Sequence, residues 1–127
     1  MERKKLTGVV QKNIGRGVRL GFPTANVETD VAGVEDGIYT ALTGVLGQKY
    51  KSLAFVGAAE TFGDKKKKLE VYILDFHQEI YGREITVQLL EKIRDNMKFE
   101  TEADLVEQMK QDEKQARTFF TTYGRIE

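Results

Sequence analysis

The chain has 127 residues, of which 40% are hydrophobic and 31% are charged, and its 20 Lys plus Arg residues balance its 20 Asp plus Glu residues. This length suits one domain with a single core, and the composition is that of a globular rather than a disordered chain. The zero net charge excludes an overall field that favours capture of nucleic acid, while zero Cys and one His exclude disulfides and Cys- or His-rich zinc sites. Metal chemistry through oxygen ligands stays open.

The N-terminus is basic from Met1 to Leu6 but leads directly into Gly and Val without an apolar leader segment. No stretch of the chain approaches the roughly 18 apolar residues of a membrane-spanning helix. The sequence therefore predicts a single cytoplasmic domain over residues 1–127, with neither a membrane nor a nucleic acid as its partner.

A glycine-rich segment follows, in which Gly15, Gly17 and Gly21 precede the single proline, Pro23. Glycines let the backbone turn sharply and approach a ligand closely, and consecutive N–H groups can surround phosphate oxygens. The segment matches neither a P-loop nor a dinucleotide-binding fingerprint. An anion-binding loop and a cluster of β-turns are both consistent with this spacing.

Thr24 and Asn26 come directly after Pro23 and are two residues apart. In an extended segment these two side chains point the same way. Their hydroxyl and amide oxygens are hard donors, which suit Mg²⁺. The alternative is a turn in which both side chains bond to their own backbone.

Short apolar runs between turn signals predict antiparallel strands through the middle of the chain. The predicted strands are residues 38–46, 49–55, 69–76 and 84–90. Gly47-Gln48 is predicted as a two-residue hairpin turn, and the run Lys65 to Lys68 as an exposed hairpin tip. Because helices do not alternate with these strands, the pattern favours a small closed barrel over a parallel sheet.

Residues 101–120 contain neither Gly nor Pro and predict a helix. Thr101 and Asp104 have the spacing of a capping box at its start. Apolar side chains recur at spacings of three, four and seven residues, and this stripe predicts that the helix covers the barrel. The stripe consists of Ala103, Leu105, Val106, Met109, Ala116, Phe119 and Phe120.

Glu70 lies within a predicted strand whose two faces are both fairly apolar. Alternation puts it on the face of Tyr72, opposite Leu69 and Val71. A carboxylate in such a place lies at a strand end or is held by partners, which is compatible with a tuned general base as well as with a structural role.

A series of motifs occurs in a fixed order along the chain. It consists of Gly8-Val9-Val10, Gly15-Arg16-Gly17, Leu20 to Asn26, Gly37-Ile38-Tyr39, Thr61-Phe62-Gly63, Glu70 to Phe76, Tyr81-Gly82, Ile93-Arg94-Asp95, Lys98-Phe99 and then Leu105, Gln108, Asp112 and Ala116. The series resembles the riboflavin kinase (flavokinase) family over roughly residues 7–117. This resemblance implies a mainly β fold, a six-stranded antiparallel Greek-key barrel with a C-terminal α-helix. It also implies transfer of the γ-phosphate of ATP to the 5′-hydroxyl of riboflavin, giving FMN.

The resemblance implies roles for individual residues on the nucleotide side. Gly15, Arg16, Gly17 and Gly21 would lie in a loop that closes over the phosphates of the co-substrate ATP. Thr24 and Asn26 would hold Mg²⁺ and nucleotide phosphate, and Glu70 would be the catalytic base. Phosphoryl transfer depends mostly on positioning and charge neutralisation, so these groups suffice for the chemistry.

On the flavin side, the resemblance implies a flap of residues 94–99 over the flavin, with Arg94, Met97 and Phe99 as flavin-binding residues. Many bacterial relatives carry this module behind a domain that converts FMN to FAD. The substrates implied for this chain are riboflavin and ATP.

Three positions depart from the usual family pattern: Glu60 replaces a Pro, Tyr72 a His and Asn96 a Glu. None of these departures affects Thr24, Asn26 or Glu70, so an active enzyme is the favoured hypothesis. The alternative is a non-catalytic flavin- or nucleotide-binding regulatory module on the same barrel. RNA binding is disfavoured, because a neutral chain with scattered aromatic residues lacks a basic stacking platform.

Overall fold

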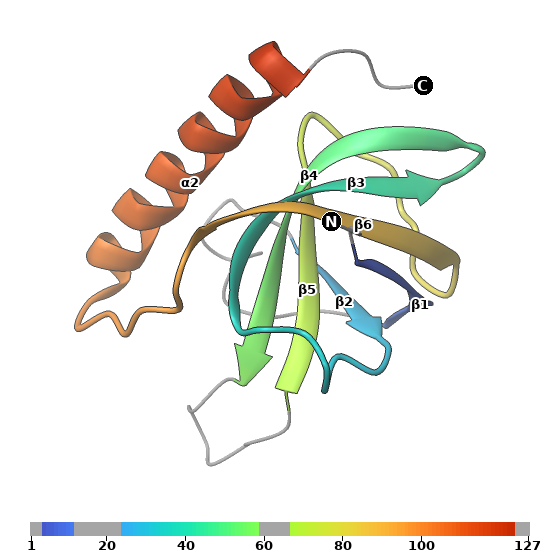
Figure 1. Ribbon diagram of the computed structural model, residues 1–127, viewed down its shortest axis with the longest axis horizontal. Helices are drawn as coiled ribbons and strands as arrows, with labels where there is room; N and C mark the ends of the chain where they lie inside the picture. Colours follow the sequence, from blue (N-terminus) through green and yellow to red (C-terminus); the bar gives the residue numbers. More distant parts are fainter. Residues whose placement is uncertain (1–3, 12–23, 59–66, 124–127) are drawn as a thin grey trace.

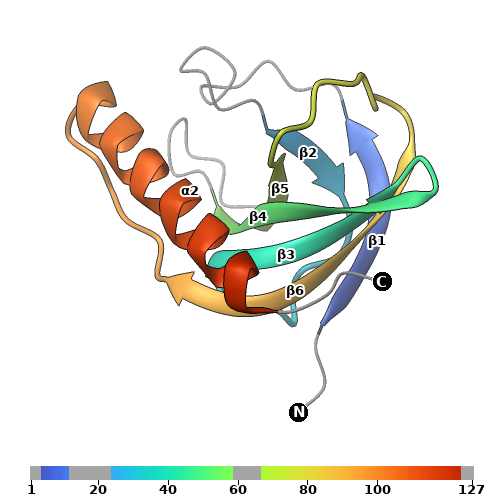
Figure 2. The ribbon, with the colours of Figure 1, turned by 90° about the horizontal axis from the view of Figure 1, so that it is seen from above.

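The computed structural model describes residues 4–11, 24–58 and 67–123. Their strands and helix are β1 Lys5–Gln11, β2 Ala25–Glu28, β3 Gly37–Val45, β4 Gln48–Ala58, β5 Lys67–Ile73, β6 Glu84–Arg94 and α2 Glu102–Tyr123. The strands close into a barrel in the order β1-β2-β5-β4-β3-β6, and α2 lies along the outside of this barrel (Figures 1 and 2). The predicted mainly β fold, an antiparallel barrel with a C-terminal helix, is confirmed.

Every pair of neighbouring strands is antiparallel, but neighbours in the barrel are not always neighbours in the sequence. β3, β4 and β5 follow one another, whereas β2 pairs with β5 and β6 inserts between β3 and β1. This order has the non-sequential neighbours of a Greek key. Closure leaves the barrel without an unpaired edge strand.

The hairpin between β3 and β4 turns at Leu46-Gly47, so the predicted turn at Gly47-Gln48 was wrong by one residue. Leu46 and Gly47 have φ angles of 54° and 77°, and Val45 pairs with Gln48. Positive φ at both central residues defines a type I′ turn, which matches the twist of the flanking strands. Glycine therefore takes the second turn position here, not the first.

β5 starts two residues earlier and ends three residues earlier than predicted, because the chain turns at Leu74-Asp75. The interpretation of the lysine run as an exposed tip does not hold for Lys67. Its Nζ donates to the carbonyl oxygen of Val34 and forms an ion pair with Asp36 at 2.7 Å. Lys67, the first residue of β5, therefore connects this strand to the segment between β2 and β3.

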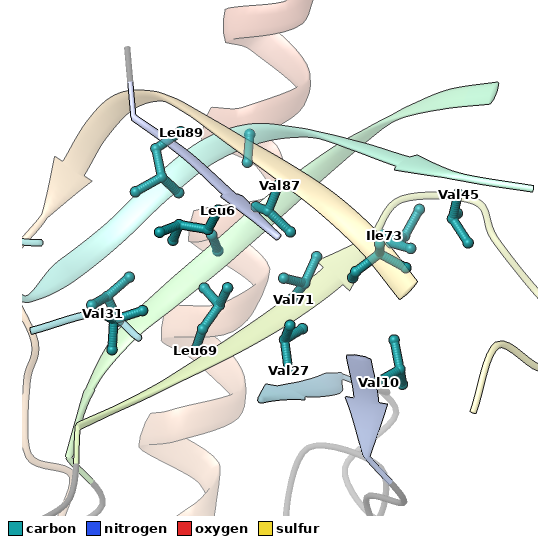
Figure 3. Packing of buried hydrophobic residues seen from close by; sticks show 14 of the residues in the cluster. Leu6, Val10, Val27, Val31, Val45, Leu69, Val71, Ile73, Val87 and Leu89 are labelled. Carbon is teal, nitrogen blue, oxygen red and sulfur yellow. The ribbon is translucent and has the colours of Figure 1, made fainter. Parts of the chain in front are cut away.

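The interior of the barrel is filled by aliphatic side chains from several strands, ten of which are labelled in Figure 3. Leu69, Val71 and Ile73 of β5 all belong to this cluster, together with Val27 of β2. Because side chains alternate across a strand, Glu70 and Tyr72 lie on the outer face. The inner core therefore fixes which polar residues of β5 face outward.

α2 packs on the outer surface of the barrel through the predicted apolar stripe. Ala116 and Phe120 are buried in a second cluster with Ile38, Leu42 and Leu53. The stripe is buried in its second half and only half-buried or exposed in its first turns, where Ala103 is exposed. The hydroxyl oxygen of Thr101 accepts the N–H of Asp104 at 3.0 Å, which confirms the predicted N-terminal cap. In the described ranges, no helix has the length and apolar character needed to cross a membrane.

Gly8 allows β1 to approach β2 closely. A Cβ at this position would collide with the carbonyl oxygen of Glu28 and would lie 2.9 Å from Cγ1 of Val27. Gly33, in contrast, has nothing within 4 Å of such a Cβ. We predict that Gly8→Ala lowers the free energy of unfolding by about 1–3 kcal/mol. Gly33→Ala should change it by less than about 0.5 kcal/mol.

Urea denaturation of the two variants tests this prediction. Equal stabilities of Gly8→Ala and the parent chain would contradict it, because they would show that β1 and β2 accommodate the added methyl group without loss of free energy of unfolding.

Candidate active site

Three of the predicted site residues meet on the outer face of the barrel, where β2 and β5 pair. Asn26 pairs with Glu70 in the register of these two strands. The Thr24 hydroxyl, one residue before β2, donates to Oε1 of Glu70 at 2.8 Å. Residues 46 positions apart in the sequence are therefore in direct contact, and all three are half-buried.

The same face continues across the barrel as one transverse row of side chains. Asn26 of β2 pairs with Glu70 of β5, Glu70 with Phe55 of β4, Phe55 with Ile38 of β3, and Ile38 with Arg94 of β6. Adjacent strands are about 4.8 Å apart, so the row covers about 14 Å between Glu70 and Arg94. Residues predicted for the nucleotide side and for the flavin side thus lie at the two ends of one row on the outer face of the barrel, and Ile38 between them is buried against α2.

Arg94 lies at the far end of this row and is held by a buried carboxylate on α2. Its Nε and Nη2 each donate to Asp112 at 2.7 Å, and its Nη1 donates to the carbonyl oxygen of Asp95 at 3.0 Å. The Asp112 side chain is only 1% exposed and also accepts from Gln108 at 2.9 Å. At least three of the five N–H donors of Arg94 are therefore engaged within the protein.

Asp112 belongs to the motif series that carries the family resemblance but was assigned no role from the sequence, although a signal for one was present. It lies three residues after Met109 and four before Ala116, on the buried side of the helical stripe. A carboxylate in an apolar stripe needs a cationic partner. Only the tertiary structure identifies this partner as Arg94.

The other two residues predicted for the flavin side, Met97 and Phe99, lie on the connection between β6 and α2. Met97 is 52% exposed, which is high for a large apolar side chain, and Phe99 is half-buried. Asn96 precedes them and donates through Nδ2 to the carbonyl oxygen of Val56 at 3.0 Å. This bond fixes the connection to the end of β4.

Tyr72 is the outward neighbour of Glu70 on β5 and connects this strand to the helix. Its hydroxyl donates to Oε1 of Glu113 at 2.9 Å, and Arg117 donates to the other oxygen of Glu113 at 3.0 Å. Burial, followed by the bond to Glu113, raises the pKa of Tyr72 to about 12. The hydroxyl is therefore a hydrogen-bond donor at neutral pH and does not compete with Glu70 as a base.

The oxygens of Thr24 and Asn26 fit the requirements of a magnesium ion held together with phosphate. A hydroxyl that donates its proton to Glu70 still presents its oxygen lone pairs, and Asn26 has a side-chain carbonyl oxygen. Mg²⁺ bound to a nucleotide commonly uses one or two protein ligands, with phosphates and water completing the octahedron. Among the described residues, no group of three or more His, Cys, Asp or Glu side chains could hold a metal ion.

The predicted phosphate loop, with Gly15, Arg16, Gly17 and Gly21, lies outside the described residues, as does Glu60. The roles predicted for them stay predictions.

A family model described as Flavokinase, riboflavin kinase, matches residues 2–120. The chain belongs to the riboflavin kinase family. The resemblance found in the sequence is thereby confirmed, and the Thr24–Glu70 contact lies within the matched range.

Curated relatives of this riboflavin kinase family member are longer proteins. The bifunctional riboflavin kinase/FMN adenylyltransferase of Listeria monocytogenes is 37% identical over 116 residues, which cover 89% of this chain and 37% of the relative. The RNA-binding riboflavin kinase RibR of Bacillus subtilis is 37% identical over 108 residues, covering 84% of this chain and 47% of that protein. The chain thus spans less than half the length of either relative.

Two solved structures are similar in fold. Riboflavin kinase from Trypanosoma brucei aligns with a TM-score of 0.69 and 22% identity, over 96% of this chain and 82% of that chain. A structure titled as a macrolide-efflux protein from Streptococcus pneumoniae aligns with a TM-score of 0.77 and 36% identity, over 89% of this chain and 38% of that chain. The barrel with its helix is therefore a fold that solved proteins share.

The two bidentate Arg–Asp pairs of this family member differ in burial, which makes them a matched test. Asp112 is buried against Arg94, whereas Asp75 is exposed, and its pairing with Arg117 at 2.9–3.0 Å lowers the pKa of Asp75. We predict that Asp112→Asn lowers the free energy of unfolding by about 3 kcal/mol, because it removes the buried half of the pair and leaves the half-buried Arg94 guanidinium without its counter-charge.

Asp75→Asn should have a much smaller effect, since exposed ion pairs contribute little to stability. Thermal and urea unfolding of both variants measure the difference. Similar losses in the two variants would contradict the anchoring role of Asp112.

Proposed function

We propose that this chain transfers the γ-phosphate of ATP to the 5′-hydroxyl of riboflavin, giving FMN and ADP. The observation that supports it most directly is the contact between Thr24 and Glu70, with Asn26 beside them, on the outer face of a riboflavin kinase family barrel. A carboxylate beside two neutral oxygen donors is the set of groups that phosphoryl transfer to an alcohol requires.

In this proposal Glu70 is the general base. It accepts the proton of the riboflavin hydroxyl as the oxygen of that hydroxyl bonds to the γ-phosphorus and the bond to the ADP oxygen breaks. The hydrogen bond from Thr24 occupies one carboxylate oxygen, Oε1, and orients the other for the substrate. No covalent enzyme intermediate is needed.

Thr24 and Asn26 are the residues that would hold Mg²⁺, each through a side-chain oxygen. When bound, Mg²⁺ neutralises charge on the phosphate oxygens. The chain itself orients the nucleotide through Thr24 and Asn26, and the segment from Gly15 to Gly21 is proposed to surround the phosphates with backbone N–H groups.

For riboflavin, we propose a site on the same transverse row, towards β6 and the segment after it. Met97 and Phe99 supply apolar surface for the isoalloxazine ring. Arg94 helps to position the segment that carries Met97 and Phe99, because two of its nitrogens are bonded to Asp112 of α2. RNA binding, which the name of the Bacillus subtilis relative states for that protein, is not proposed for this chain, whose net charge is zero.

The alternative, a non-catalytic binding module, depends on the three departures from the family pattern. Tyr72 and Asn96 make structural contacts with Glu113 and Val56, and neither replaces Glu70 or Thr24. No observation on the described residues therefore favours this alternative over the kinase.

The proposed reaction is tested by incubating the 127-residue chain with riboflavin, ATP and Mg²⁺ and separating the flavins by chromatography. We expect FMN and ADP in equal amounts and no FAD, because this chain aligns with 37% of the bifunctional Listeria monocytogenes relative and the family model that matches residues 2–120 is a riboflavin kinase. A metal chelator should stop the reaction. Flavin binding without FMN formation would support the binding module instead.

Glu70→Gln isolates the proposed base within this assay, because it keeps the size of the side chain but cannot accept the proton. Turnover should fall roughly 10²–10⁴-fold while both substrates still bind. Glu84→Gln is the matched control, since Glu84 is an exposed carboxylate at the start of β6. Near-normal turnover of Glu70→Gln would assign the base to another group.

Thr24→Ala and Asn26→Ala should weaken binding of MgATP by about tenfold or more, because each removes an oxygen that contacts charged groups. Riboflavin affinity should change much less, since neither oxygen faces the ring in this proposal. Titrations of each variant with riboflavin and with a non-hydrolysable ATP analogue measure the two effects, with Thr7→Ala, at an exposed position of β1, as the control. Unchanged nucleotide affinity in both variants would remove Thr24 and Asn26 from the site.

A further inference from the structure

The side chain of Asn96 bonds to β4 at the point where the pairing between β3 and β4 ends. Gly37, the first residue of β3, pairs with Val56, so Val56 is the last residue of β4 with a partner on β3. Asn96, two residues after the end of β6, donates through Nδ2 to the carbonyl oxygen of Val56 at 3.0 Å. The segment that follows β6 is thus bonded to β4, across the end of β3.

The surface of β4 has room for this amide because residue 57 is glycine. A Cβ at Gly57 would collide with Nδ2 of Asn96, and Oδ2 of Asp36 would lie 3.7 Å from it on another side. Gly57 and Asn96 are therefore complementary in shape, and a side chain at position 57 would displace the amide.

The chemistry of the contact requires an amide. An ionised carboxylate has no proton to donate, and it would place its charge against the Val56 carbonyl oxygen. The sequence resemblance indicated a Glu as the common residue at this position. Asn96 is therefore not a lost carboxylate here, but a residue that makes a bond which Glu cannot make.

The bond completes a second attachment of the segment between β6 and α2. Arg94 holds the start of this segment to Asp112 of the helix, and Asn96 holds it to β4. Met97, which is 52% exposed, comes directly after the second attachment. Two attachments within three residues leave the backbone before Met97 little freedom to reorient.

We propose that Asn96 is a positioning residue for riboflavin: its bond to Val56 holds the segment of residues 95–100 in the conformation that receives the flavin ring. This inference rests on the proposed function. A segment that is already ordered loses less conformational entropy when the ligand binds, so the bond increases affinity for riboflavin without contributing to the transfer step.

Asn96→Asp tests this role, because it keeps the shape of the side chain and replaces the donor by an acceptor. We expect the dissociation constant of riboflavin, measured by quenching of flavin fluorescence, to rise on the order of tenfold, with a similar rise in its KM. The turnover number and the KM for ATP should stay within about twofold of the parent values, since neither depends on the segment in this proposal.

Asn96→Ala should reproduce this pattern, because it removes the same donor. Asp75→Asn is the control outside this segment. It breaks an exposed ion pair with Arg117 and leaves the bond from Asn96 to Val56 intact, so riboflavin affinity should not change.

Unchanged or tighter riboflavin binding in Asn96→Asp would overturn the proposal. So would an equal loss of affinity for ATP, which would indicate a general structural defect. Absence of FMN formation by the parent chain would instead count against the proposed function, and the binding titration would still decide whether Asn96 positions the segment for riboflavin.

Discussion

The candidate site depends on the pairing of β2 with β5. These strands are separated by the whole β3–β4 hairpin in the sequence, and only closure of the barrel places them side by side. Because Val27 and Leu69 must both point into the core, Asn26 and Glu70 must both point outward. A shift of the register by one residue would bury the carboxylate and separate it from Thr24. The aliphatic core therefore determines the geometry of the polar site.

The helix contributes to the site from the opposite end of the same row. Ala116 and Phe120 fix α2 on the barrel by apolar contact, which has no directional preference. The Arg94–Asp112 pair adds direction, since two charge-assisted hydrogen bonds allow few relative positions of β6 and α2. The segment between β6 and α2 is therefore attached to the helix through Arg94 and to β4 through Asn96. It begins at the end of the row that carries Glu70.

The sequence predicted the antiparallel barrel and the helix because their signals are local. Alternation identified the strands, and a stripe without Gly or Pro identified α2. The hairpin turn was misplaced by one residue, since Gly47 is compatible with either of two turn types and only the strand register decides between them. β6 was predicted too short because Lys92 and Arg94 interrupt its apolar alternation, although both are engaged in ion pairs.

The site was predictable in part. Thr24, Asn26 and Glu70 could be proposed from the family resemblance, but alternation alone left the role of Glu70 open. Their contact depends on non-local pairing, for which a single sequence carries no signal. Asp112 and the bond from Asn96 to Val56 escaped prediction for the same reason: each joins a polar side chain to a partner from another element. Polar tertiary contacts of this kind have no periodicity that a sequence pattern can reveal.

In the proposed mechanism, Thr24 contributes to catalysis both by holding Mg²⁺ and by orienting the carboxylate of Glu70. A double-mutant cycle of Thr24→Val and Glu70→Gln on the turnover number at saturating MgATP and riboflavin tests it most directly. If Thr24 acts partly through Glu70, Thr24→Val should slow the Glu70→Gln variant by a smaller factor than it slows the parent chain, so that the separate losses do not multiply fully. Losses that multiply fully would show that the two side chains act independently, and would contradict this account of the site.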